Sequence, residues 1–154
     1  MAWIFALWAQ CGTGDDANAF IAHFEGLSWT LSDGTATHCE VSLLSNTCCW
    51  ITPTNLSHSG VSNANDAAQL TEVGKRLYER LRSAPPFRFA MVGVEVDDVR
   101  TEIEVEEMIR ASHSAYQGLV VSTDLWQRAG KPSAFRTFRP GHVWRPYMGE
   151  TKPG

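Results

Sequence analysis

The residue types best suited to acid–base chemistry lie near the end of the chain, in the segment FRPGHVWRPY (138–147). His142 titrates near neutral pH, and a histidine within reach of a substrate can give or take a proton. Arg139 and Arg145 flank it, and guanidinium groups bind carboxylates and phosphates in a fixed geometry. With His58 of a polar loop, these residues define one hypothesis: a cleft for an anionic substrate, with His142 as the acid–base residue and the arginines as anion clamps.

The same segment also has a purely structural interpretation. Arg139-Pro140-Gly141-His142 fits a type II turn, with proline at the second position and glycine at the third. The aromatic residues on either side can anchor the tail against a sheet, and prolines remove amide donors in the way typical of an edge strand. The arginines then point outward or neutralise an acidic helix.

Carboxylates provide a second candidate site. Six of them crowd into a run that holds Arg100 as its one basic residue: Asp97, Asp98, Glu102, Glu104, Glu106 and Glu107. In a helix that starts near residue 102, their like charges cost stability at i,i+4 spacing. We therefore expect this acidic face to bind a cationic partner, and internal pairing with the tail arginines is the competing interpretation.

Cysteine and histidine spacing argues against a metal site. The cluster with four zinc-ligand types consists of His38, Cys39, Cys48 and Cys49. A two-residue hairpin turn at Ser45-Asn46 would spread these residues along two strands and over both faces, whereas zinc needs four convergent ligands. The same register places Cys48 opposite Leu43 and holds Cys39 beyond the reach of a disulfide. We expect no metal or other cofactor, and four free, buried cysteines, among them Cys11.

Length and charge narrow the class of protein. A chain of 154 residues with 44% hydrophobic and 19% charged residues is the size and composition of one globular domain. The net charge of −4 lowers the expectation of nucleic-acid binding. The apolar start at 2–9 lacks the basic region of a signal peptide and is too short to span a membrane. The sequence thus predicts a cytoplasmic protein that binds neither nucleic acid nor membrane.

The order of predicted elements indicates an α+β fold. Strands are expected at 2–10, 36–44, 47–52, 87–96 and 119–121, helices at 16–25, 66–83 and 101–116, and a helical turn before Gly130. The second helix, with Asn65 as its N-cap, is predicted from the helical spacing of its apolar residues: Leu70, Val73, Leu77 and Leu81. Thr101 and Glu104 form a capping-box pattern at the start of the third helix. A polar loop is expected at 53–65, and an extended, irregular tail from Phe135 to Tyr147. Neither a repeat nor a linker divides the chain, so residues 1–154 should form a single domain. We predict a central mixed β-sheet with two to three helices packed mainly on one face.

Residues 118–150, GLVVSTDLWQRAGKPSAFRTFRPGHVWRPYMGE, resemble the C-terminal part of small immunity proteins of bacterial polymorphic-toxin systems. There, a strand, a short helical turn and an aromatic, proline-punctuated tail close an α/β domain. The resemblance implies a cytosolic domain without catalytic activity, which neutralises a basic, toxin-like protein by blocking its site.

The sequence therefore supports three hypotheses of function. The first is a small non-catalytic binding protein, immunity-like, that uses its acidic face. The second is a small enzyme with the Arg/His cleft, and the third is a self-associating domain that forms a homodimer.

Overall fold

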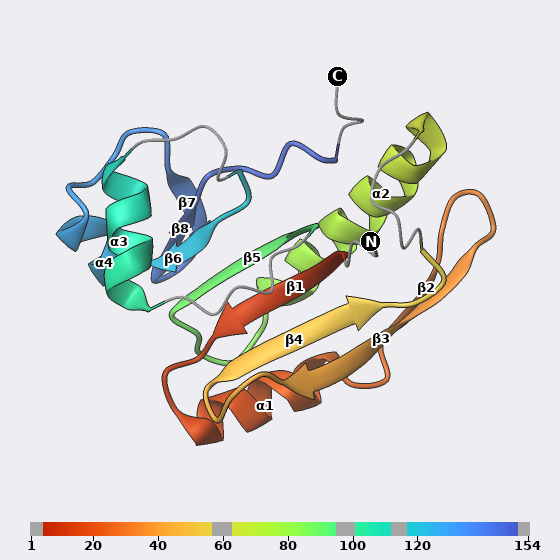
Figure 1. Cartoon of the computed structure of the whole chain (residues 1–154), viewed down its shortest axis with the longest axis horizontal. Coiled ribbons are helices and arrows are strands. Elements are labelled where there is room, and N and C mark those ends of the chain that lie inside the picture. Colours follow the sequence, from red (N-terminus) through yellow and green to blue (C-terminus); the bar gives the residue numbers. More distant parts are fainter. Residues whose placement is uncertain (1–4, 57–62, 95–100, 112–116, 151–154) are drawn as a thin grey trace.

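The computed structural model describes residues 5–56, 63–94, 101–111 and 117–150. At its centre is an open sheet of eight strands in the order β2-β3-β4-β1-β5-β6-β8-β7 (Figure 1). The strands are β1 (Phe5–Gln10), β2 (Ser28–Thr30), β3 (Ala36–Leu43), β4 (Cys48–Pro53), β5 (Phe89–Val94), β6 (Val120–Ser122), β7 (Arg136–Arg139) and β8 (His142–Trp144). The helices are α1 (Gly14–Phe24), α2 (Ala64–Leu81), α3 (Glu102–Arg110) and α4 (Thr123–Arg128). The predicted α+β class is confirmed.

All strand pairings in the described residues are antiparallel, so the prediction of a mixed sheet is wrong. Tight turns join β2 to β3, β3 to β4 and β7 to β8, and such turns can only connect antiparallel neighbours. The connections that contain helices also bring each strand back opposite in direction to the strand it pairs with.

Two hydrophobic cores lie on opposite faces of this sheet. One contains Leu7 of β1 with Phe20 of α1 and Leu77 of α2, and the other contains Trp8 of β1 with Val105 of α3. Successive side chains of a strand point to opposite faces, so β1 supplies both cores and is apolar throughout. The predicted covering of mainly one face is not confirmed, because α1 and α2 pack on one face while α3 and α4 pack on the other.

The longest helix is confirmed with a shifted start. The four apolar residues whose spacing predicts it are all fully buried: Leu70, Val73, Leu77 and Leu81. The helix begins two residues earlier than expected, because Asn63 rather than Asn65 is the N-cap and accepts the Asp66 backbone N–H at 2.9 Å. An asparagine at this position satisfies one of the unpaired amides of the first turn.

The third helix begins as predicted and is shorter. Thr101 and Glu104 form the expected capping box, in which each side chain accepts the backbone N–H of the other residue. In the described residues α3 ends at Arg110, with Ala111 as its C-cap. The remainder of the predicted helix, 112–116, lies outside the described residues.

The hairpin between β3 and β4 has a different register from the one predicted. Leu43 lies opposite Cys49, and Leu44 N donates to Cys48 O at 3.0 Å, so the loop has three residues, not two. Ser45 favours the longer loop because its Oγ accepts the Cys48 backbone N–H at 3.2 Å.

The new register does not create a disulfide. Cys11, Cys39, Cys48 and Cys49 are free and buried, as predicted. Cys11 and Cys49 lie on the same face of the sheet, with their sulfur atoms 3.9 Å apart. In the ranges that the structure describes, no group of three or more histidine, cysteine or acidic side chains is arranged to hold a metal ion.

The C-terminal tail is more regular than predicted. Residues 136–144 form the β7–β8 hairpin at the end of the sheet, where Gly141 has φ +87°, as a type II turn requires. Trp144 is half-buried and packs against Phe138 with ring centroids 4.9 Å apart. The prediction of an edge strand is confirmed. Of the described helices, none is both long enough and apolar enough to cross a bilayer.

Candidate functional site

The acidic face predicted on α3 is partly paired within the chain. Arg88, which precedes β5, donates from Nη2 to Glu102 Oε1 at 2.7 Å and to Asp124 Oδ2 at 2.8 Å. Arg128 of α4 reaches the same Glu102 oxygen at 3.1 Å. Hydrogen bonding to Arg88 lowers the pKa of Asp124 to about 2, and the two carboxylates raise the pKa of Arg88. Glu102 is thus the centre of a charge network that joins α3 and α4 to the start of β5.

The other described carboxylates of α3 serve mainly the helix itself. Glu104 accepts the Thr101 backbone N–H at 3.1 Å, and Glu106 pairs with Arg110 at 2.7 Å. Glu107 is exposed. The competing interpretation of internal pairing therefore applies to part of this face, although the paired arginines precede β5 or belong to α3 and α4, and none of them belongs to the C-terminal tail. Three predicted site residues lie outside the described residues: His58, Asp97 and Asp98.

Arg139 caps a helix, and its guanidinium is committed there. Its Nη1 donates to carbonyl oxygens at the end of α2, at 3.3, 3.4 and 2.6 Å: Leu81, Arg82 and Ala84. The last carbonyls of a helix lack intrahelical partners and attract cations. The guanidinium also lies over the Phe87 ring, 4.7 Å from its centroid, and burial lowers its pKa.

His142 is buried beside this arginine. Its Nδ1 accepts a hydrogen bond from Arg139 Nε at 3.2 Å, which places the ring proton on Nε2, and Nε2 donates to the Phe87 carbonyl at 2.8 Å. The ring stacks on Phe87 at a centroid distance of 4.3 Å. Burial is the main cause that lowers its pKa, and the Arg139 charge adds to the effect. Both ring nitrogens are occupied, so this geometry offers neither to a substrate.

Arg145 continues the strand pairing through its backbone. Its N–H donates to Leu119 O at 3.1 Å, and its carbonyl accepts from Gly118 N at 2.7 Å. The fold brings Arg139 and His142 of the predicted cleft together. Their side chains, however, bind the end of α2 and the Phe87 carbonyl. The two pockets described below are lined by other residues.

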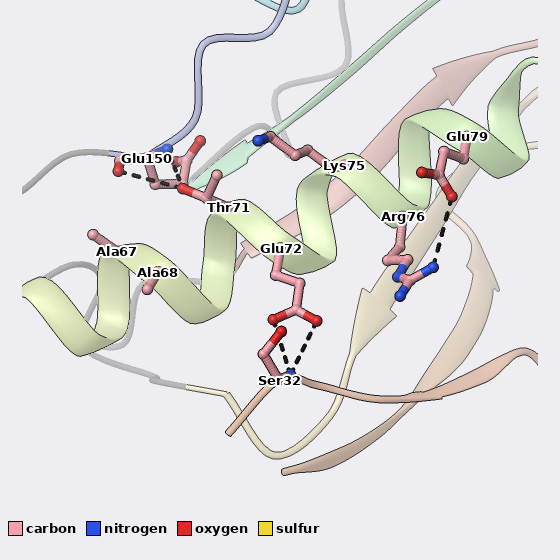
Figure 2. Close-up of a pocket in the computed structure, with 9 residues that line it drawn as sticks. All are labelled: Ser32, Ala67, Ala68, Thr71, Glu72, Lys75, Arg76, Glu79 and Glu150. Carbon is pink, nitrogen blue, oxygen red and sulfur yellow. Dashed lines mark hydrogen bonds and ion pairs between the residues drawn. The ribbon is translucent and has the colours of Figure 1, made fainter. Parts of the chain in front are cut away.

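A groove of about 610 Å³ runs along the outer side of α2, between the turn after β2 and the C-terminal tail (Figure 2). Glu72 accepts the Ser32 backbone N–H with both carboxylate oxygens at 3.1 Å. Arg76 pairs with Glu79 at 3.9 Å. Lys75 extends from the same helix toward Glu150 (Figure 2). Charges of both signs line the groove, so it has no strong preference for an anion or a cation.

One wall of this groove is the C-terminal tail, held tightly on α2. Tyr147 donates from its hydroxyl to Glu150 Oε2 at 2.6 Å, and Glu150 N donates to Thr71 Oγ1 at 2.8 Å. A Cβ atom at Gly74 would lie 2.6 Å from the Tyr147 hydroxyl oxygen, so the ring fits only because that helical position has no side chain. Burial raises the pKa of Glu150.

The carboxylates of the N-terminal half are arranged differently from those of α3. Residues 1–74 contain seven acidic side chains and neither lysine nor arginine. Asp15 of α1, Glu25 at the end of that helix and Glu40 of β3 are exposed. In the described part of the chain, none of these three forms an ion pair. They are free to meet cations from outside.

The face of the sheet from which Glu40 projects is open at β3 and β4. None of the helices in the described residues crosses the front of β3 and β4, whereas α2 lies behind β1 and β5 (Figure 1). His38, Glu40 and Ser42 are exposed on β3. Trp8 and Trp50 are paired in register on neighbouring strands, and their buried indole N–H groups have no hydrogen-bond partner. Unsatisfied buried donors are rare in folded proteins.

Comparison of the chain with models of protein families, with curated proteins and with solved structures finds no significant match. The resemblance of residues 118–150 to immunity proteins therefore stays a prediction.

Sequence reasoning missed two features of this geometry. Arg88 was not predicted to be a partner of the acidic helix, although it is the last basic residue before the carboxylate run. Strand β2 was missed because three residues, Ser-Trp-Thr, are too short for an alternating pattern to be seen.

Proposed function

We propose that this chain is a non-catalytic protein-binding domain, and that its acidic N-terminal half engages a basic partner. The observation that carries the proposal is the set of exposed carboxylates Asp15, Glu25 and Glu40, which lack ion-pair partners among the described residues. Neutralisation of a basic bacterial toxin is the biological setting that the C-terminal resemblance implies.

The position of these carboxylates supports binding. Glu40 projects from β3 on the front side of the sheet, where no described helix covers that strand, whereas Asp15 and Glu25 belong to α1 or its end, behind the same strands (Figure 1). A surface that carries charge of one sign steers an oppositely charged protein toward it and raises the association rate. On α3, by contrast, Glu102 and Glu106 are already paired with arginines. The binding face expected from sequence is therefore proposed to shift from α3 to the N-terminal half.

The enzyme hypothesis receives less support from the geometry. Its acid–base residue, His142, is bonded through both ring nitrogens, and its anion clamp, Arg139, caps α2. A general base has to reach the proton it removes, and neither side chain is free to do so without breaking a structural contact.

Affinity capture with a test variant and a control variant of reduced charge tests the proposal. In the test variant, Asp15→Asn, Glu25→Gln and Glu40→Gln remove three unpaired charges. In the control variant, Glu104→Gln and Glu107→Gln remove two charges from α3 and leave the capping box possible. Wild type and the control should retain one stoichiometric basic protein from a lysate of the source organism, and the test variant should lose it.

Salt provides the second arm of this experiment. The association rate of the captured protein with wild type should fall several-fold as ionic strength rises to ~0.1 M, where the screening length is ~10 Å. Loss of the partner from the α3 control instead would return the interface to α3. Retention by all three proteins, with no effect of salt, would refute an electrostatic binding face.

A further inference from the structure

The two edges of the sheet differ in whether another strand could join them. At one edge, β7 is irregular: its register with β8 shifts between Thr137 and Arg139, and the Phe138 carbonyl already accepts a hydrogen bond from Arg82. A bulge and an occupied carbonyl both obstruct the addition of a strand. At the opposite edge, β2 is short but pairs with β3 without a register shift.

The pairing of β2 with β3 shows which residues of β2 are bonded to the sheet. Leu31 N donates to Thr35 O, and Cys39 N donates to Leu27 O, both at 2.8 Å. Along an antiparallel strand, residues bonded to the neighbour alternate with residues whose backbone groups point the other way. Leu27 and Leu31 are therefore bonded residues, and so is Trp29 between them.

It follows that Ser28 and Thr30 direct their backbone N–H and C=O groups off the edge of the sheet. Both residues are exposed. Among the described residues, no hydrogen bond engages these outward groups. Two residues with free donors and acceptors at the right spacing form the short template that an extended peptide needs for strand addition.

The charges around β2 indicate which peptide would fit. Glu25 lies just before the strand, Asp33 lies in the turn after it, and Glu40 lies on β3; all three are exposed. Asp33 accepts hydrogen bonds from Thr35 N at 2.9 Å and Gln69 Nε2 at 2.6 Å, and these bonds lower its pKa. It therefore remains ionised well below neutral pH.

A small pocket adjoins the same edge. It has a volume of about 280 Å³, and its lining includes Ser28, Thr30 and His38. Ser28 and Thr30 lie opposite His38 and Ala36 in register, so their side chains share the open face of the sheet with Glu40. A side chain from an added strand could lie here, within reach of that carboxylate.

We infer that the free edge of β2 accepts an extended, lysine- or arginine-bearing segment of the partner protein as an additional strand. Main-chain hydrogen bonds to Ser28 and Thr30 supply affinity, and the surrounding carboxylates select a basic segment. A second copy of this chain fits less well, because self-pairing would bring two acidic N-terminal halves together. The inference rests on the proposed function and names the contact through which it would operate.

Amide hydrogen exchange with a defined peptide tests the inference. The probe is a synthetic peptide of about eight residues, the length of an ordinary strand, that alternates lysine with threonine. In the free protein, the Ser28 and Thr30 amides should exchange rapidly, while those of Trp29 and Leu31 are protected by β3. At saturation, exchange at Ser28 and Thr30 should slow at least about tenfold, with little change at Trp29 and Leu31.

Two control peptides separate strand addition from attraction by charge. The first carries an N-methyl group on every amide, which keeps the charge but removes the main-chain donors of both edges. The second replaces each lysine with glutamate. Both should fail to protect Ser28 and Thr30. Equal binding of the N-methylated peptide, or no saturable binding of the lysine peptide, would overturn the inference.

A protein variant provides an independent check. Thr30→Pro removes an outward N–H that makes no bond to β3, and proline is tolerated at such edge positions. This variant should fold and should lose most of its affinity for the lysine peptide. If Thr30→Pro is unfolded, the N-methylated peptide still decides the question on the wild-type protein.

The outcomes also separate this inference from the proposed function. A natural basic partner that binds Thr30→Pro as tightly as wild type, but not the Asp15/Glu25/Glu40 variant, would refute β2 as the contact and leave the binding function standing. Protection of Ser28 and Thr30 that rises with protein concentration in the absence of peptide would show self-pairing instead, and would overturn the choice of partner.

Discussion

Arg139 and His142 illustrate how residues suited to catalysis can be used for structure. Both belong to the segment that most resembles a reactive loop in the sequence. In the folded chain, Arg139 binds carbonyls at the end of α2, and His142 bridges Arg139 to the Phe87 carbonyl. A guanidinium and an imidazole together can satisfy several backbone carbonyls that would otherwise be buried without partners. The two side chains thereby join the terminal hairpin to the helix.

This use of His142 predicts a dependence of stability on pH. Its pKa in the folded protein lies below the ordinary value of 6.5, because burial and the Arg139 charge disfavour the protonated ring. As pH falls below 6.5, the unfolded chain binds a proton that the folded chain does not bind. The contribution of His142 to the free energy of unfolding is therefore complete above pH 6.5 and is lost as pH falls toward the pKa in the folded protein. Over this range the free energy of unfolding falls by at most about 1.4 kcal/mol per pH unit through this residue.

Urea denaturation at a series of pH values between neutrality and about pH 5, the range in which histidine titrates, measures this slope. His142→Gln should be less stable near neutral pH and should lack this contribution to the slope, because glutamine does not titrate. An unchanged slope in His142→Gln would mean that this histidine is not held neutral by the fold.

Between elements, the packing of the C-terminal tail on α2 depends on a glycine, which has no side chain. Gly74 is buried in the middle of α2, and Tyr147 packs directly over it. Helix propensity alone favours alanine over glycine in a helix by up to about 1 kcal/mol. The contact opposes that preference, since a Cβ atom would lie 2.6 to 2.9 Å from atoms at the end of the tyrosine side chain.

We therefore expect Gly74→Ala to lower the free energy of unfolding by roughly 1–3 kcal/mol, the usual cost of overpacking. Urea denaturation of a double-mutant cycle with Tyr147→Ala checks the cause. In the Tyr147→Ala background, Gly74→Ala should be neutral or stabilising, because the ring that it would strike is gone. Stabilisation by Gly74→Ala in the wild-type background would show that the tail moves aside at little cost.

Local sequence patterns predict helices and their caps more reliably than contacts between residues that are distant in the chain. The spacing of Leu70 and Leu77 predicts α2, and the Thr101 capping box predicts the start of α3, because the causes lie within a few residues of one another. The contacts of Arg88 and Arg139 could not be predicted in this way. Arg139 reaches carbonyls 55 to 58 positions away in the chain, and only the folded sheet brings them together.

The errors in the sheet have a similar origin. Tight turns fix neighbouring strands as antiparallel, but the pairing of β1 with β4 and β5 depends on tertiary packing that periodicity does not report. The predicted β3–β4 register differs from the observed one by one residue, because the Ser45 hydroxyl accepts the Cys48 backbone N–H and the loop is one residue longer. The candidate binding edge was missed altogether, since free backbone groups leave no mark on side-chain composition.

For the molecule as a whole, the sheet is shared by the two cores. Strands β1, β4 and β5 contribute side chains to both, so the packing on one face depends on the strands that support the other. This arrangement favours cooperative unfolding, in which neither pair of helices separates without disrupting strands that the opposite core needs.

Two adjacent cysteines provide a direct test of that cooperativity. Cys48 belongs to the core under α3 and α4, and Cys49 belongs to the core under α1 and α2; both are fully buried. They share the same strand and almost the same sequence context, so their reactivities in the unfolded chain should be similar. A difference in their labelling in the native state would therefore report a difference in opening between the two faces.

Alkylation at a series of low urea concentrations, followed by peptide mass spectrometry, should give equal free energies of opening for the two thiols, each close to that of global unfolding. Faster labelling of Cys48 would instead show that α3 and α4 open as a separate unit, and a bound partner that contacts only the N-terminal half would then leave the protection of Cys48 unchanged.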